Sequence, residues 1–137
     1  MTEPSAGERE GPAPRRNFQV SVETRFVATE SDPAEPRYVF AYTITIANHG
    51  SEAAQLLNRY WLITDGDGHQ KEVRGPGVVG NQPRIAPGEA FRYTSACVLE
   101  TEVGVMQGHY EFQGADGDAF DVPIDAFTLA APNVIVH

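Results

Sequence analysis

The chain contains little that could cross-link it or anchor it in a membrane. Cys97 is the one cysteine among 137 residues, which excludes an intrachain disulfide and a cysteine-rich zinc site. No stretch approaches the roughly 20 consecutive apolar residues of a membrane-spanning helix. The N-terminus also lacks the basic region followed by an apolar stretch that marks a signal peptide. We therefore expect a cytoplasmic protein whose fold depends on an apolar core.

Positive charge is scarce as well. Lysine and arginine together number 10, against 19 aspartates and glutamates, so the formal net charge is -9. Phosphate backbones and anionic lipid surfaces repel such a chain, and we expect neither nucleic acid nor a membrane as a partner. The acidity favours cationic partners or divalent ions, but charge of this kind also serves solubility alone.

Helical periodicity is missing, and short segments alternate between apolar and polar residues instead. The clearest is residues 38–47, in which Phe40, Tyr42, Ile44 and Ile46 share one face. Such alternation is typical of half-buried strands. The expected strands cover residues 18–26, 38–47, 56–64, 70–73, 90–98, 105–113, 119–124 and 127–130, with a brief extended piece at 84–86. Seven to eight short strands separated by turn signals predict an all-β fold, either a sandwich or a barrel.

The N-terminal segment differs in composition from the rest of the chain. Residues 1–16 are rich in proline, glutamate, glycine and serine and contain almost no large apolar side chains. That composition predicts a mobile tail, followed by one domain over residues 17–137.

Two residues of special chemistry fall on expected core faces. Trp61 shares a strand face with Leu57, Arg59 and Ile63, and we expect it to be buried between the sheets. Cys97 lies in an alternating apolar run, where a free cysteine acts as a small buried hydrophobe rather than as a nucleophile.

The segment RGPGVVGNQP at residues 74–83 carries glycines at the spacing of a dinucleotide-binding loop, namely Gly75, Gly77 and Gly80. A Rossmann site requires the last glycine to open a helix, and Pro83 interrupts any helix here. A P-loop would need lysine and serine or threonine after the last glycine, and asparagine and glutamine stand there. The segment therefore predicts a glycine-rich connection between strands, with no nucleotide cofactor of either kind.

The same segment is nevertheless the best candidate for binding an anion or a partner. Arg74 offers bidentate donors for phosphate or carboxylate. Exposed backbone amides around Gly75, Gly77 and Gly80 can form a nest for the same groups. The alternative is that these glycines only allow a long connection to cross the edge of the sandwich. The sequence alone does not decide between these two interpretations.

No catalytic or metal-binding constellation emerges from the sequence. Asp65 and Asp67 alternate with glycines, which we interpret as a hairpin turn. Gln107, His109 and Glu111 form a row on one strand face, which we interpret as a polar, solvated surface. Nothing combines a nucleophile, a base and an orienting group. We therefore expect no enzymatic activity, no metal and no cofactor.

Several motifs in order give the chain a family resemblance. They are RYWLITD at residues 59–65, the glycine segment, PGE at 87–89, YTS at 93–95 and GVMQGHY at 104–110. Together they resemble the ApaG (CorD) domain, and the resemblance spans roughly residues 18–129.

The resemblance implies more than the pattern alone can. It implies an antiparallel β-sandwich of the fibronectin type III-like or immunoglobulin-like kind, in place of a barrel. Relatives fused to F-box and polymerase-associated proteins imply a non-enzymatic, adaptor-like module with a protein partner. The family is also associated with cobalt resistance and magnesium efflux. Its glycine motif has been discussed as a phosphate, pyrophosphate or nucleotide site, and a homodimer is compatible with all of these roles.

Overall fold

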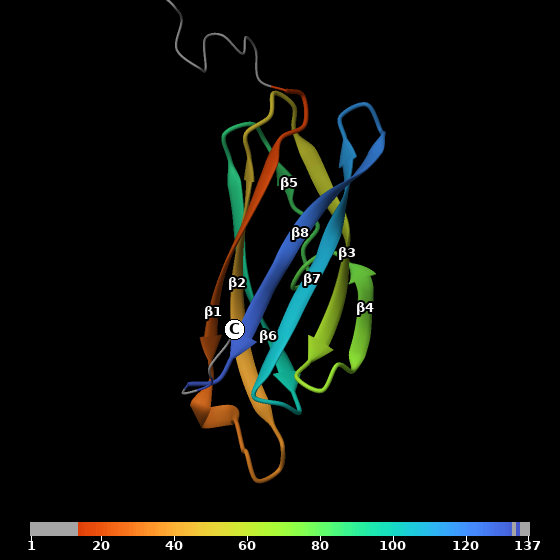
Figure 1. Cartoon of the computed structure of the whole chain (residues 1–137). Helices are drawn as coiled ribbons and strands as arrows, with labels where there is room; N and C mark the ends of the chain where they lie inside the picture. Colours follow the sequence, from red (N-terminus) through yellow and green to blue (C-terminus); the bar gives the residue numbers. More distant parts are fainter. Residues whose placement is uncertain (1–13, 133, 135–137) are drawn as a thin grey trace, which may run out of the picture.

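The computed structural model describes residues 14–132 and residue 134, and its strands form two antiparallel sheets (Figure 1). The strands are β1 (Phe18–Phe26), β2 (Tyr38–Asn48), β3 (Ala54–Asp65), β4 (Gln70–Pro76), β5 (Arg84–Ile85), β6 (Ala90–Leu99), β7 (Val103–Gly114) and β8 (Ala119–Ala130). Among the described residues the one helical element is a short 3-10 turn, η1 (Ala28–Glu30). No helix in the described part of the chain is long and apolar enough to cross a membrane.

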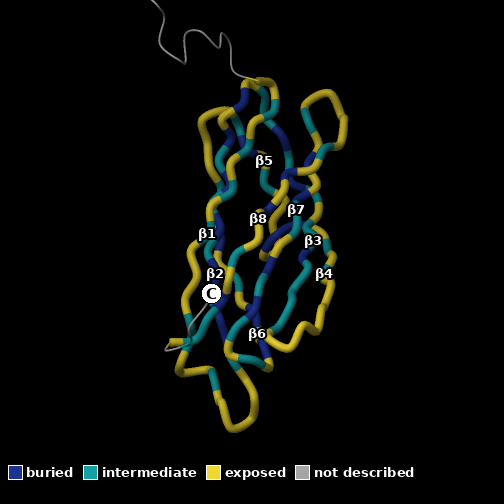
Figure 2. The backbone as a smooth tube through the Cα atoms, viewed as in Figure 1, coloured by how far each residue is buried: buried dark blue, intermediate teal, exposed yellow. Residues whose placement is uncertain are grey.

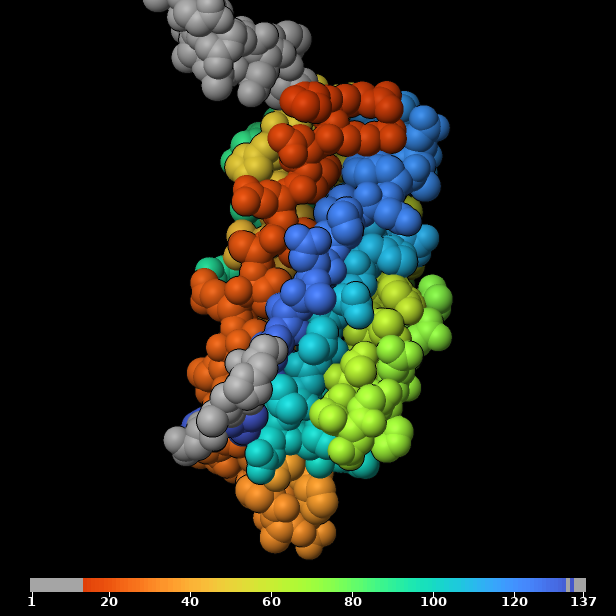
Figure 3. Space-filling model, viewed as in Figure 1, coloured from red at the N-terminus to blue at the C-terminus, as the bar shows by residue number. Residues whose placement is uncertain are grey.

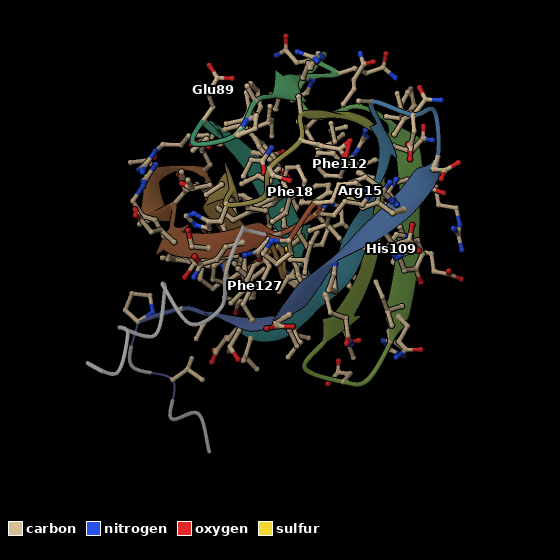
Figure 4. The ribbon with its side chains drawn as sticks, turned by 90° about the horizontal axis from the view of Figure 1, so that it is seen from above. Arg15, Phe18, Glu89, His109, Phe112 and Phe127 are labelled. Carbon is tan, nitrogen blue, oxygen red and sulfur yellow. The ribbon has the colours of Figure 1, made fainter. Side chains whose placement is uncertain are left out.

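The two sheets face each other as layers (Figure 4). One has three strands in the order β1-β2-β6, and the other has five, in the order β4-β3-β7-β8 with β5 added beside β3. On one side of the sandwich, β1 of the first sheet and β8 of the second lie against each other (Figure 3). On the other side the sheets end in β6 and β4. This arrangement confirms the predicted antiparallel β-sandwich.

The core lies between the sheets and follows the predicted alternation of β2 (Figure 2). All four residues of its apolar face are buried. They meet buried residues of β7, including Met106, Tyr110 and Phe112. At the end of the sandwich near the N-terminus, the rings of Phe18 and Phe112 lie 4.7 Å apart between the layers (Figure 4). Cys97 and Trp61 are both buried, as predicted.

A bulge in β3 corrects one prediction. The register between β3 and β7 shifts between Leu56 and Asn58, so Leu57 is an extra residue without its own partner. The inward and outward positions exchange at that point. Leu56 is therefore fully buried, and Leu57 is only half-buried. The expectation that Leu57 shares the core face with Trp61 is wrong for this reason.

A second register shift joins two expected strands into one. β8 runs without a break, although the sequence predicts separate pieces at residues 119–124 and 127–130. Between Met106 and Gly108 of β7 the pairing moves from Phe127 to Ile124, so β8 carries an extra residue there. The apolar positions change from even to odd numbers across this bulge, which looks like the end of a strand in the sequence.

The predicted tail falls partly outside the described residues, because residues 1–13 are not among them. Arg15 and Arg16, which the prediction places in the tail, contact the domain. Their guanidinium groups pair with Asp116 at 3.0 and 3.1 Å, and the backbone carbonyl of Arg15 accepts a hydrogen bond from the Glu52 N–H. Residues 14–16 of the predicted tail therefore lie against the domain.

Candidate functional site

The glycine segment forms a tight loop after β4, not the start of a helix. Gly77 and Gly80 adopt positive φ angles of 63° and 82°. The backbone N–H of Gly77 donates to Leu57, and Val78 and Asn81 exchange two backbone hydrogen bonds at 2.8 Å each. β5 follows within a few residues. The prediction of a connection between strands is confirmed, and three of the loop's amides are already used inside the protein.

Arg74 is not brought together with this loop. Its guanidinium lies over the ring of Tyr60, 4.3 Å from the ring centroid, and Nη2 contacts Glu72 at 3.3 Å. Tyr60 also donates a hydrogen bond to Glu72 and stacks on His109 at 5.0 Å. Arg74 and His109 thus cover the outer face of the five-stranded sheet, away from Gly77 and Gly80.

The arginine at the glycine loop is Arg59 instead. Its Nη1 donates to the carbonyls of Pro76 and Gly77, both at 3.0 Å. Gly75 lies opposite Arg59 in the β3–β4 ladder, and a Cβ there would approach Nη1 to 3.0 Å. Gly75 therefore leaves room for this guanidinium. The sequence offered one signal for it, because Arg59 is a charged residue on the same strand face as Trp61.

A groove runs along the open side of the sandwich, between the free edges of β4 and β6. It consists of two adjoining cavities of about 530 and 380 Å³, which share Tyr42, Arg59, Trp61 and Ser95 as lining residues. Most other lining residues belong to β4, β6 and the glycine loop. We call this feature the edge groove, and its volume suits a ligand or a short peptide segment.

The thiol and the tyrosine hydroxyls that line the edge groove are held in their protonated, unreactive forms at neutral pH. Burial raises the pKa of the Cys97 thiol to about 11, so the nucleophilic thiolate is scarce. Burial also raises the pKa of Tyr42 and of Tyr93 above the usual tyrosine value. This environment suits contact with a ligand better than proton transfer.

Asp65, Asp67 and His69 lie close together at the other end of the edge groove, with ligand atoms within 4.8 Å of one another. Their geometry is that of the predicted hairpin turn. Asp65 Oδ1 accepts hydrogen bonds from the backbone N–H groups of Asp67 and His69, at 2.9 and 3.0 Å. These bonds lower the pKa of Asp65 against the opposing effect of its desolvation. The carboxylate is thus occupied in shaping the turn.

Comparison with known proteins places these features in a family. The ApaG domain profile matches residues 28–114, which include the glycine loop and all the lining residues of the edge groove. Protein ApaG of Azotobacter vinelandii is 55% identical over 122 residues, which cover 89% of this chain and 97% of its own length. Protein ApaG of Azoarcus sp. is 55% identical over 118 residues, covering 86% and 93%.

A solved structure agrees with the fold as well as with the sequence. The crystal structure of a Bordetella pertussis protein described as ApaA superposes with a TM-score of 0.86 at 50% identity, covering 90% of this chain and all of that one. The fold, the order of motifs and these relatives lead to one conclusion: the chain belongs to the ApaG domain family.

Proposed function

We propose that this protein is a non-enzymatic, adaptor-like module that binds another protein through the edge groove. The observation that carries the proposal is the groove itself, which lies between two strand edges that pair with nothing in the described part of the chain. An uncovered strand edge is a template for pairing with another chain. Protein-binding domains commonly use such edges together with adjacent side-chain pockets.

The side chains of the groove support binding rather than catalysis. Its floor is apolar and aromatic, with Trp61 and Met106 buried beneath it. Val79 and Val98 are the two large hydrophobic residues exposed among the described residues, at 53% and 51%, and both line the groove. Exposed apolar side chains that gather beside one groove are typical of a contact surface.

The proposal is tested by affinity capture with the full-length protein. The immobilised protein is exposed at physiological salt to a lysate of the organism that encodes it. We expect at least one protein to be retained in near-stoichiometric amount and to be displaced by free protein. An unrelated acidic β-sandwich protein, immobilised in the same way, is the control. If this protein retains no more than the control does, the proposal is wrong.

A second candidate is a module that binds phosphate or pyrophosphate, favoured by the guanidinium of Arg59 at the glycine loop. The engaged amides of Gly77, Val78 and Asn81 weigh against a tight site, so we expect affinity in the millimolar range, about -4 kcal/mol. An NMR titration with pyrophosphate tests it. Shifts confined to Arg59 and residues 75–80 would support this candidate, and their absence would remove it.

The family's association with cobalt and magnesium suggests a third role, as a regulator linked to divalent cations. Because the Asp65 carboxylate already accepts two backbone hydrogen bonds, we propose that any such role acts through a partner and not through a tightly held ion. Calorimetry with cobalt and magnesium discriminates, since tight stoichiometric heat would contradict the indirect route.

A further inference from the structure

The outer edge of β6 carries backbone groups that the fold leaves unused. Opposite β6, Val39 of β2 donates its N–H to Ser31 Oγ at 2.9 Å and accepts at its carbonyl from the Val27 N–H at 2.8 Å. Both groups of Val39 therefore point away from β6. Val39 is paired with Val98 in the β2–β6 ladder. In an antiparallel pair, the backbone N–H and C=O groups of the two residues either bond each other or all point away from the shared ladder. The N–H and C=O of Val98 therefore face the free edge.

The period of a strand extends this conclusion along β6. Backbone groups of alternate residues point to the same edge, so those of Ala96 and Thr94 also face outward. The edge groove runs beside them. Five successive residues of β6, from Ser95 to Leu99, line the same cavity. Successive side chains point to opposite faces of a sheet, and only a cavity along the strand's edge touches all five.

The free edge of β4, across the groove, is poorly suited to pairing with another strand. Asp65 bonds to His69, and Gly77 bonds to Leu57, through backbone groups. The odd-numbered positions of β4 therefore bond to β3, and Gln70, Glu72, Arg74 and Pro76 face outward. Proline has no N–H to offer, and charged residues discourage pairing. The equivalent positions of β6 in the half of the strand beside the groove are Thr94, Ala96 and Val98, and none of these is charged or a proline.

The groove also contains a positive charge that the protein does not neutralise with a carboxylate. Among the described residues, Arg59 makes no salt bridge, and its side-chain hydrogen bonds go to two carbonyls through Nη1 alone. Lys71 lines the same cavity. The carboxylates of the groove, Asp65 and Glu100, come from the ends of strands, and Asp65 lies beside His69 at 3.4 Å. A carboxylate from outside would find bidentate donors at Arg59.

Apolar contacts are available on both sides of that charge. Val98 lines the cavity beside β4, and Val79 lines the adjoining cavity at the glycine loop. Val79 adopts a φ of 42°, a conformation that β-branched residues rarely take. The loop therefore holds an exposed apolar side chain at the mouth of the groove at a cost in backbone strain, which is common in binding segments.

We propose that the edge groove binds an extended acidic peptide segment of a partner protein, which pairs with the free edge of β6 as an added strand and places a carboxylate on Arg59. The segment alternates apolar and polar residues, because its inward side chains meet the apolar floor of the groove. This inference rests on the proposed protein-binding function. It adds that the partner pairs with β6, that one of its carboxylates binds Arg59, and that the partner segment is an extended acidic peptide.

A second copy of the chain fits this site less well. β6 itself contains Arg92 and no acidic residue. An edge-to-edge dimer through β6 would therefore supply no carboxylate from that strand to Arg59.

The test uses a phage-displayed library of random peptides of about twelve residues, selected on the full-length protein. We expect enriched peptides to alternate apolar residues and to contain aspartate or glutamate. Arg59→Gln and Val98→Asp should each weaken binding of the synthetic peptides about tenfold or more, as loss of a central contact does. Arg74→Gln and Ala119→Asp are the controls: the first removes an arginine and the second introduces an aspartate, each at an exposed residue that does not line the groove, and both should bind as the wild type does.

Backbone pairing has its own variant and its own readout. Ala96→Pro removes an N–H that faces the free edge and not β2, so the protein should still unfold cooperatively on heating but should lose peptide binding. Amide hydrogen exchange at Thr94, Ala96 and Val98 should slow when the wild type binds the peptide. Faster or unchanged exchange at these three amides would overturn strand addition.

Four further results would overturn the inference. The first is the enrichment of no peptide, and the second is peptides that bind Arg59→Gln and Val98→Asp as well as the wild type. The third is a dimer in sedimentation velocity that Val98→Asp dissociates, which would make a second copy the occupant. A partner captured from lysate equally by wild type and both variants would also sink this inference but leave the proposed function standing. Failure of the wild type to capture any partner would sink the proposed function itself.

Discussion

The hydroxyls of Tyr93 and Tyr110 hydrogen-bond to each other inside the core and so join the two sheets of the sandwich. Tyr93 belongs to β6 and Tyr110 to β7. Both side chains are buried, and no other described side chain forms a hydrogen bond with either hydroxyl. Burial raises the pKa of each phenol well above its usual value, so both stay protonated and one donates to the other.

Removing one of these hydroxyls should cost more than removing both. Tyr110→Phe leaves the Tyr93 hydroxyl buried without a partner, and we expect the free energy of unfolding to fall by about 1–3 kcal/mol. Tyr93→Phe should have a similar effect. The double variant should be no less stable than either single one, as measured by urea unfolding. Additive losses would show that the two hydroxyls act independently.

Trp61 should report the packing between the sheets. It is 2% exposed and meets the rings of Tyr42 and Phe127 edge-on, at 5.5 and 5.8 Å between centroids. Trp61→Ala should lower the free energy of unfolding by about 3–5 kcal/mol, because it removes a large core side chain. In the wild type, tryptophan fluorescence should shift to longer wavelength only on unfolding. An emission already red-shifted in the native protein would contradict burial.

The bulge in β3 predicts unequal effects for two neighbouring leucines. Leu56 is fully buried and Leu57 is half-buried. Leu56→Ala should cost about 2–5 kcal/mol, the range for a core leucine, and Leu57→Ala should cost clearly less. Thermal or urea unfolding of the two variants side by side decides the matter. A larger effect at Leu57 would mean that the register shift lies elsewhere.

Period-two alternation was sufficient to predict the strands and the all-β fold, but not the bulges, and the choice of a sandwich over a barrel came from the family resemblance. The face of β2 from Phe40 to Ile46 alternates without interruption, and the structure buries it as predicted. A bulge adds one residue on one strand alone, so its signal is a change of phase that depends on the partner strand. At the β3 bulge the two neighbouring residues, Leu56 and Leu57, are both leucine, so the sequence does not show which one faces inward.

The candidate site was harder to predict than the fold for a similar reason. Arg74 is adjacent to Gly75 in the sequence, but adjacent residues of a strand point to opposite faces. Arg59 is distant in the sequence and reaches the glycine loop because it pairs with Gly75 across the β3–β4 ladder. The edge groove likewise depends on which strands lie at the edges of the two sheets. The alternation of apolar and polar residues within a strand does not reveal the order of the strands in a sheet.

Acid should weaken the contact between the N-terminal arginines and the domain. The Asp118 N–H and the guanidinium groups of Arg15 and Arg16 lower the pKa of Asp116. Since this pKa is lower in the folded than in the unfolded state, the contact stabilises the fold above the unfolded value of about 3.9, and the stabilisation is lost as pH falls through the folded value. The melting temperature of Asp116→Asn should therefore fall less steeply in acid than that of the wild type. Asp121→Asn, which removes an aspartate without a described ion pair, should follow the wild type.

The glycines of the loop should differ in what they contribute, which matters for any binding experiment. Gly80 has a φ of 82° with open space around it, so Gly80→Ala should cost about 1–2 kcal/mol from backbone strain alone. At Gly77 a Cβ would also lie 2.4 Å from the backbone oxygen of Asn81. Gly77→Ala should therefore be the more destabilising change and should disturb the loop that holds Arg59.

Loss of binding in Gly77→Ala would consequently not identify Gly77 as a ligand contact. Arg59→Gln is the variant to compare, because it removes the charge and two hydrogen bonds to loop carbonyls but adds no methyl group to the loop. Urea unfolding should rank Gly77→Ala below Gly80→Ala, and two-dimensional NMR should show shifts around Asn81 in the former alone. Equal stability of the two glycine variants would mean that the loop relaxes around the added methyl group, and Gly77 would then be free to serve in binding.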